Sequence, residues 1–204
     1  HFYIIYTSGS TGQPKGALVC DGNISNLLSW YSSEYQFNAN DRHLLVSAIG
    51  FDLTQKNIYS PLATGGTLVI PDFEQFDSTL LGQIIKKQQV TVINGAPSML
   101  YPLLENDPGR LKSLRLVLFG GERVELARLR PWLEHSDNRA ELVNMYGPTE
   151  CADIATTCRL SIEQANVFLQ RGDELPIGRP IANVGVYILN RFGQPVPVRE
   201  EGEL

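Results

Sequence analysis

Cysteine is scarce in this sequence and does not occur at the spacings that bind metals. The 204-residue chain contains only Cys20, Cys151 and Cys158, and it has no Cys-x-x-Cys pair. A disulfide framework requires more cysteines at regular spacings, and a zinc site of this type requires paired ones, so both are excluded. We therefore expect reduced cysteines in a cytoplasmic protein.

Histidine is equally scarce, with three residues in the whole chain. His1, His43 and His135 are scattered among polar neighbours, and they follow no metal-ligand or catalytic-triad pattern. We expect all three to lie on the surface.

Excess positive charge and long apolar runs are also missing. The formal net charge is -5, which argues against a nucleic-acid surface because such surfaces are usually basic. No apolar run approaches the length that crosses a bilayer, and no secretory signal is visible. Neither a nucleic acid nor a membrane is expected as a partner. Because the chain begins at His1 and stops at Leu204 without a closing signal, we expect a piece of a longer protein.

The patterns that are present predict an α/β fold with a mostly parallel sheet and flanking helices. Apolar residues make up 43% of the chain, enough for a packed core. Short β-branched or aromatic runs predict strands at 2–6, 43–48, 67–70, 91–94, 115–119, 141–146 and 184–189. Amphipathic stretches predict helices at 24–35, 53–64, 78–88, 98–105 and 125–133.

Particular residues indicate where some of these helices start and stop. Asn23 and Asp77 are candidate N-caps, and Gly65-Gly66 is a suitable stop after the second helix. The polar stretch 161–180 is expected to connect one layer to another.

A loop rich in glycine and hydroxyl groups follows the first predicted strand. Glycines let the backbone approach a ligand closely, hydroxyls donate hydrogen bonds, and a lysine supplies a cation for a polyphosphate. The candidate phosphate-binding residues are Thr7, Ser8, Gly9, Ser10, Thr11, Gly12 and Lys15. The loop is not a Walker A motif, because Lys15 follows Pro14 and precedes Gly16. From these residues alone, a flexible loop without a ligand is the alternative.

A second segment, Asn144-Met-Tyr-Gly-Pro-Thr-Glu150, follows a predicted strand. Tyr146 offers a face for stacking, Thr149 a hydroxyl, and Glu150 a hard oxygen ligand suited to Mg²⁺. A tight Gly-Pro turn with an exposed acid is the simpler interpretation of this segment in isolation.

Together these motifs resemble the adenylate-forming, or AMP-binding, superfamily, which includes acyl-CoA synthetases, firefly luciferase and the adenylation domains of nonribosomal peptide synthetases. The run Tyr6-Thr-Ser-Gly-Ser-Thr-Gly-Gln-Pro-Lys-Gly16 is similar to the family's AMP-binding signature. The resemblance implies that Tyr146 packs on adenine, that Asn144 hydrogen-bonds the base, that Thr149 meets phosphate and that Glu150 holds the metal. It implies catalytic roles for Thr7, Lys15, Thr149 and Glu150.

Further segments agree in order with the same family. Phe119-Gly-Gly-Glu122 is similar to its adenine-side turn, which assigns Gly120 and Gly121 to the nucleotide side and leaves Glu122 as a helix N-terminal acid. The resemblance of Asn144–Glu150 adds Gly147 to the nucleotide side. Pro176-Ile-Gly-Arg-Pro180 and Glu201-Gly-Glu-Leu204 also fit. The resemblance therefore covers residues 1–204, as the central part of the large N-terminal subdomain. The family's C-terminal lid subdomain, with its catalytic lysine, is not in this chain.

Asp52, in Phe51-Asp52-Leu53-Thr54, points to one branch of the family. A helix-start aspartate often only caps the helix. In peptide synthetase adenylation domains, however, the aspartate of this Phe-Asp pair binds the α-ammonium of the amino acid. The resemblance then implies a substrate pocket lined by Asp52, Leu53, Lys56, Asn94, Leu118, Gly120, Met145, Asp153 and Ile154.

Lys56 and Asp153 are unusual in an apolar pocket, because buried charges are tolerated mainly as a pair or against a polar ligand. They suggest a polar or charged side chain on the substrate. The alternatives are that the two charges neutralise each other, or that Lys56 points to solvent.

The resemblance implies ATP- and Mg²⁺-dependent activation of an amino acid as its aminoacyl-AMP, with release of pyrophosphate. The aminoacyl group then passes to the phosphopantetheine thiol of a carrier protein, beside a condensation domain of the parent synthetase. An acyl- or aryl-CoA synthetase core is one alternative, and a non-catalytic remnant acting as an interaction module is another.

Overall fold

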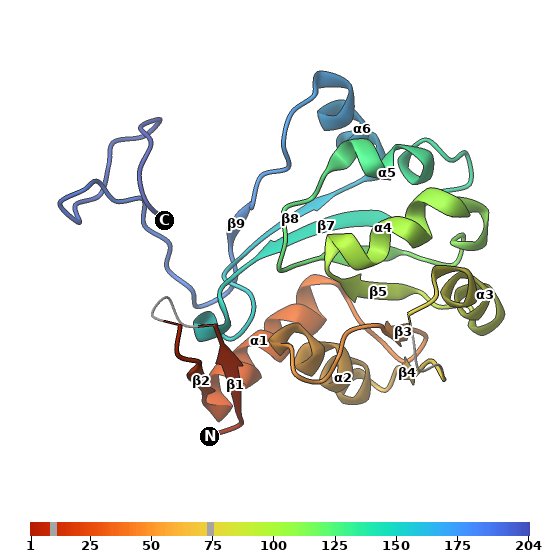
Figure 1. Ribbon diagram of the computed structural model, residues 1–204, viewed down its shortest axis with the longest axis horizontal. Coiled ribbons are helices and arrows are strands. Elements are labelled where there is room, and N and C mark those ends of the chain that lie inside the picture. The colour runs from red at the N-terminus through yellow and green to blue at the C-terminus, as the bar shows by residue number, and fades with distance from the viewer. Residues whose placement is uncertain (9–11, 73–75) are drawn as a thin grey trace.

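A seven-stranded, mostly parallel sheet organises the chain, as predicted (Figure 1). The computed structural model describes residues 1–8, 12–72 and 76–204. The spatial order of strands is β4 (Thr67–Val69), β3 (Arg42–Leu45), β5 (Val92–Gly95), β6 (Leu116–Phe119), β7 (Glu141–Tyr146), β8 (Thr156–Leu160) and β9 (Arg179–Pro180). The strands from β4 to β7 are parallel, whereas β8 pairs antiparallel with β7 and with β9. A separate antiparallel hairpin joins β1 (Tyr3–Thr7) and β2 (Lys15–Val19).

The central strand β6 is apolar along its whole length because helices cover both faces of the sheet. In β6, all four residues are fully buried. Val117 and Phe119 pack into one hydrophobic cluster, and Leu116 and Leu118 pack into the other. This alternation follows from the period of two in an extended strand.

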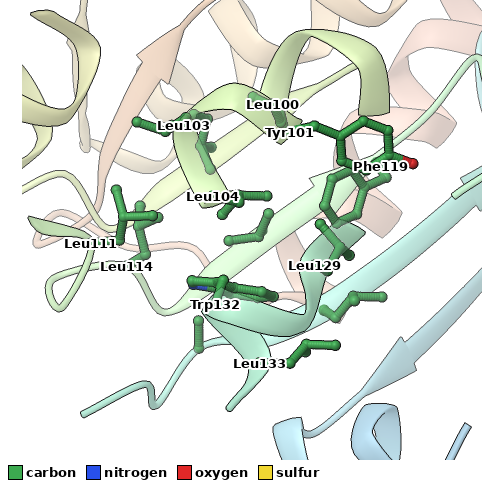
Figure 2. Packing of buried hydrophobic residues seen from close by; sticks show 14 of the residues in the cluster. Leu100, Tyr101, Leu103, Leu104, Leu111, Leu114, Phe119, Leu129, Trp132 and Leu133 are labelled. Carbon is green, nitrogen blue, oxygen red and sulfur yellow. The ribbon is translucent and has the colours of Figure 1, made fainter. Parts of the chain in front are cut away.

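The helices divide between the two faces. Residues of α3 (Ser78–Gln88), α4 (Pro97–Asn106), α5 (Leu126–Leu133) and α6 (Ile162–Arg171) form the larger cluster. Figure 2 shows side chains of α4 and α5 pointing toward one another around Trp132 and Phe119. On the opposite face lies α1 (Asp21–Glu34), with α2 (Asp52–Thr64) against it. Two short 3₁₀ turns, η1 (Pro108–Arg110) and η2 (Thr149–Cys151), complete the elements.

Two of the predicted helix ends are confirmed. Asp77 caps α3, and its Oδ1 accepts hydrogen bonds from the backbone nitrogens of Thr79 and Leu80 at 2.8 and 3.1 Å. Gly65 ends α2 with φ of 75°, a conformation that favours glycine. Across the described ranges, no helix combines the length and the apolar character that crossing a membrane requires.

The predicted strand at 184–189 is wrong. Only Leu189 pairs there, in isolated bridges to Pro195 and Glu203, and the run lies outside the sheet. In Figure 1 this violet-blue end of the chain extends away from the sheet. A β-prone run forms a strand only where a neighbouring strand satisfies its backbone, and among the described residues only Ile188 and Leu189 of this run have such partners.

Several predicted boundaries also need correction. The stretch 161–180 contains α6, which Ser161 and Gln164 start with a capping box and which buries Ala165 and Leu169 one turn apart. The strands β2, β8 and β9 were not predicted. Asn23 is not the N-cap of α1; the helix starts at Asp21 after Cys20, and the Asn23 side chain accepts from the Cys20 nitrogen.

His43 is not a surface residue. It lies on β3 with 3% exposure, and its ring centroid is 4.5 Å from that of Phe37. Burial lowers its pKa to about 4, so the imidazole is neutral at pH 7.

Candidate functional site

The predicted site residues gather where the parallel strands end. Asn94 lies near the end of β5 and pairs in register with Leu118 of β6, while Asn144 of β7 pairs with Phe119. In open α/β sheets, ligands bind outside the carboxyl ends of the strands. The segments that follow β3, β6 and β7 carry most of the remaining candidates, and the β1–β2 hairpin carries those of the phosphate loop.

A cavity of about 400 Å³ opens beside the end of β7. Of the predicted nucleotide-side residues, Gly121, Asn144, Tyr146 and Gly147 line it. Gly120 is buried and does not belong to the described lining. Residues that the sequence did not assign to the nucleotide complete the wall: Glu122, Arg123, Val124, Met145, Glu174, Leu175 and Ile177. A cavity of this size and position suits a purine base.

Two polar side chains of β7, Asn144 and Tyr146, line this cavity. Tyr146 is 44% exposed, so a face of its ring is available for stacking. Asn144 is buried, and its Nδ2 donates a hydrogen bond to the carbonyl oxygen of Pro176 at 3.0 Å. This bond holds the segment that contributes Leu175 and Ile177. The similarity of Pro176–Pro180 to the family was the only sequence signal for that wall.

The expectation that Glu122 is the N-terminal acid of the helix that follows it, α5, is wrong. Its carboxylate accepts hydrogen bonds from the backbone nitrogen and hydroxyl of Ser98, at 3.0 and 2.8 Å. It therefore stabilises the start of α4, which precedes it in the chain, and it ties that helix to the turn after β6.

Gly147 is a glycine for steric reasons. A Cβ at this position would lie 2.4 Å from the carbonyl oxygen of Asp153 and 2.6 Å from the nitrogen of Ala155. The backbone around Asp153 thus packs directly against the cavity wall. No larger residue fits without displacing it.

Thr149 and Glu150 lie in η2, directly after this wall. Glu150 is exposed and takes part in none of the ion pairs found among the described residues. The same residues contain no cluster of three or more His, Cys, Asp or Glu side chains that would hold a metal by itself. A single carboxylate fits Mg²⁺ that keeps water and phosphate oxygens as its other ligands.

The β1–β2 hairpin carries the phosphate-loop candidates. Thr7 and Lys15 are register partners at the end of the hairpin that carries the loop, and the Thr7 hydroxyl donates to the Lys15 carbonyl at 3.4 Å. Lys15 is exposed, and β2 contacts η2, which places the base of the loop beside Thr149 and Glu150. Ser8 and Gly12 are exposed, whereas Gly9, Ser10 and Thr11 lie outside the described residues.

Asp52 is the first residue of α2, and its Oδ1 accepts a hydrogen bond from the Leu53 nitrogen at 2.7 Å. One carboxylate oxygen therefore takes part in the helix start. Asp52 is only partly buried, so its carboxylate remains accessible to a ligand.

Lys56 and Asp153 form an ion pair, so Lys56 does not point to solvent. Lys56 Nζ lies 2.5 Å from Asp153 Oδ2, with side-chain exposures of 0% and 10%. Ala152 and Asp153 both have positive φ, 58° and 84°, a conformation that residues with a Cβ rarely adopt. This turn aims the carboxylate at Lys56, and strain of this kind gathers at functional sites.

Three of the other predicted pocket residues form an apolar wall in this region. Leu118, Met145 and Ile154 pack with Tyr31 in the second hydrophobic cluster, and Tyr3 packs against it. Asn94 Nδ2 donates to Asn57 Oδ1 at 2.8 Å. Tyr3 and Tyr31 were not predicted as pocket residues, because an aromatic residue in a strand or a helix has the same sequence pattern as a core residue.

Comparisons with known proteins agree with this geometry. A family model described as "AMP-binding enzyme" matches residues 1–204. A dimodular nonribosomal peptide synthase of Bacillus subtilis is 37% identical over 99% of the chain, and the chain spans 9% of that relative.

Two solved structures are also similar. The N-terminal subdomain of Klebsiella oxytoca NpsA, in complex with 3-hydroxyanthranilyl-AMSN, has a TM-score of 0.83 and 25% identity, covering 98% of this chain and 50% of its own. The nonribosomal peptide synthetase FmoA3 in its AMPPNP-bound form has a TM-score of 0.79 and 28% identity, covering 95% and 20%.

Proposed function

The chain belongs to the AMP-binding enzymes, and we propose on that basis that it is the central part of an adenylation domain that activates an amino acid as aminoacyl-AMP. Residues 1–204 are then part of the large N-terminal subdomain. The similarity to nonribosomal peptide synthetases, one of them in an AMPPNP-bound form, supports both statements.

The observation that carries the proposal is a shared wall between two compartments. Gly147 lines the cavity of about 400 Å³, and the Asp153 backbone packs against Gly147. Asp153 in turn lies close enough to Asp52 that the Asp52 charge contributes to the raised pKa of Asp153, after the larger effect of burial. A nucleotide in the cavity and an amino acid at Asp52 therefore face each other across the end of β7.

In the proposed reaction, an oxygen of the amino-acid carboxylate attacks the α-phosphorus of ATP. A new bond forms between that carboxylate oxygen and the α-phosphorus. The bond between the α-phosphorus and the oxygen that bridges to the β-phosphate breaks, and pyrophosphate leaves with the electron pair. Asp52 binds the α-ammonium, while Lys15, Thr7 and Thr149 hold phosphate oxygens. Positioning and charge neutralisation supply the rate, without a covalent enzyme intermediate. Mg²⁺ at Glu150 would neutralise further phosphate charge.

For the base, Tyr146 stacks on adenine and the Gly121 turn approaches its edge. The Oδ1 of Asn144 accepts a hydrogen bond from the base, while its Nδ2 donates to the Pro176 carbonyl. The glycines and hydroxyls from Ser8 to Gly12 complete the phosphate loop in this proposal.

The acceptor of the activated group is, in this proposal, the phosphopantetheine thiol of a carrier protein in the same synthetase. A cytoplasmic location fits that assignment. It also fits the three cysteines, which are all free among the described residues.

The test is amino-acid-dependent exchange of pyrophosphate into ATP by the full-length protein, with and without Asp52→Ala. Removing a carboxylate that pairs with a desolvated ammonium should lower kcat/KM for the amino acid by about 100-fold or more, roughly 3 kcal/mol. Asp21→Ala is the matched control, because Asp21 is also the first residue of a helix. Exchange that depends only on fatty or aryl acids would assign the chain to the acyl-CoA synthetases, and no exchange would favour a non-catalytic remnant.

A further inference from the structure

The ion pair between Lys56 and Asp153 is buried where the proposed amino-acid side chain would lie. Besides Asp153, Lys56 Nζ contacts only the Leu53 carbonyl, at 3.5 Å, and the Tyr31 ring, 5.8 Å from its centroid, in the described part of the chain. Removing two charges from water is costly, and an apolar pair of the same volume is often no less stable. The pair is therefore better explained by selection among ligands than by stability.

A charge count restricts the ligand. Asp52 and Asp153 contribute two negative charges near each other, and Lys56 contributes one positive charge. The remaining negative charge is balanced by the α-ammonium of the substrate. A further charge on the substrate side chain would leave the cluster unbalanced in a poorly solvated site, which is strongly unfavourable.

Unpaired polar atoms exclude an apolar ligand. Among the described residues, Tyr3 Oη, Tyr31 Oη and Asn94 Oδ1 are buried without a hydrogen-bond partner. Both tyrosines lie near Asp153, because its charge contributes, after burial, to their raised pKa values, and the Tyr31 hydroxyl lies within hydrogen-bonding reach of the Asn94 side chain, which lowers the pKa of Tyr31 in part. The Nδ2 of Asn94 donates a hydrogen bond to Asn57, which leaves the Oδ1 of Asn94 for another partner. An aliphatic side chain would leave the Tyr3 hydroxyl without a partner and would add nothing to the strained pairing of Tyr31 with Asn94, at a cost in free energy.

We propose that this chain selects amino acids with an uncharged, hydrogen-bonding side chain, such as a hydroxyl or a carboxamide, and that the Lys56–Asp153 pair enforces the exclusion of charge. The inference rests on the proposed amino-acid activation and specifies its substrate class. Hydroxyls of Tyr3 and Tyr31 donate or accept, and Asn94 Oδ1 accepts, so a side chain with both capacities satisfies the site.

The first test compares amino acids of nearly equal size in pyrophosphate exchange by the full-length protein. The sets are leucine, asparagine and aspartate; methionine, glutamine and glutamate; and valine and threonine. The proposal expects the best substrate to be neutral and polar, with kcat/KM about 100-fold or more above its apolar and charged counterparts. A best substrate that is apolar or charged would overturn the inference and leave amino-acid activation intact. Exchange with no amino acid would overturn the proposed function and this inference with it.

The second test reverses the charge count. Asp153→Asn removes one negative charge, so an acidic side chain should gain at least tenfold relative to its amide. Lys56→Met removes the positive charge, so lysine or ornithine should gain relative to glutamine. Each result is a ratio measured on one preparation, so partial unfolding does not change it.

The exposed pair Lys112–Asp137 provides the matched control. Lys112 Nζ also lies 2.5 Å from Asp137 Oδ2, but the two side chains are 57% and 49% exposed. Lys112→Met and Asp137→Asn should leave both ratios unchanged. If the Asp153 and Lys56 variants also leave them unchanged, the pair has no role in selection.

Discussion

The Glu122 carboxylate accepts two hydrogen bonds from Ser98, one from the backbone nitrogen at 3.0 Å and one from the hydroxyl at 2.8 Å. Ser98 lies in the first turn of α4, which follows β5, and Glu122 follows β6, so the contact joins the ends of two neighbouring parallel strands. Because Glu122 also lines the proposed adenine cavity, the contact fixes the turn that meets the base.

Replacing Glu122 should therefore affect ATP more than the amino acid. We expect Glu122→Ala to raise the KM for ATP about tenfold, or ~1.4 kcal/mol, through the loss of hydrogen bonds to a charged acceptor. The KM for the amino acid should change less than twofold. Steady-state pyrophosphate exchange measures both, and Glu125→Ala, at a nearby exposed position, is the control. An unchanged KM for ATP would show that the contact only supports the helix.

Gly147 should tolerate no side chain. In Gly147→Ala, the new Cβ would approach the Asp153 carbonyl oxygen to 2.4 Å, so the turn that carries Asp153 must move. We expect binding of both nucleotide and amino acid to weaken, by at least tenfold each, because the two compartments share this wall. Calorimetric titration with a non-hydrolysable ATP analogue and with the amino acid measures the two losses. Gly22→Ala is the control, since a Cβ there meets nothing within 4 Å; wild-type affinities in Gly147→Ala would contradict the shared wall.

His43 should make the stability depend on pH. Burial lowers its pKa to about 4, below the ordinary value of 6.5, so the unfolded chain binds more protons between these two pH values. Stability is then fully present above pH 6.5 and is lost as the pH falls toward 4. From pH 8 to pH 5 this residue accounts for a loss of about 2 kcal/mol.

Urea unfolding of the wild type and His43→Leu at the two pH values isolates that contribution. The variant should lose about 2 kcal/mol less than the wild type between pH 8 and pH 5. The half-buried His135 provides the comparison, and His135→Leu should keep the wild-type dependence. Equal losses in all three proteins would mean that His43 is protonated in the folded state.

The central sheet could be predicted because its strands carry strong local signals. The runs 115–119 and 141–146 are mostly apolar, and both form strands whose central residues are buried. By contrast, α6 has a polar sequence in which only Ala165 and Leu169 are buried, so its helical period is hard to recognise. The run 184–189 has strand-like residues, but whether it pairs depends on neighbours that the local sequence does not contain.

The site could be predicted as a set of residues but not as a geometry. Motif resemblance selected Asp52, Lys56 and Asp153, yet the contact between Lys56 and Asp153 depends on the positive φ values at Ala152 and Asp153. The residue types at 152 and 153 do not indicate a positive φ, since neither is glycine. Tyr3 and Tyr31 were missed because their role depends on unpaired hydroxyls, which only the structure reveals.

The most direct measurement of the central claim follows the carboxylate oxygen itself. The full-length protein is incubated with ATP, Mg²⁺ and an accepted amino acid labelled with oxygen-18 in its carboxylate, and hydroxylamine is added to cleave the adenylate at the carbonyl carbon. Attack of the carboxylate on the α-phosphorus predicts one oxygen-18 atom in the AMP, none in the pyrophosphate, and loss of labelled AMP in Asp52→Ala. AMP without label, or labelled phosphate in its place, would contradict amino-acid adenylation.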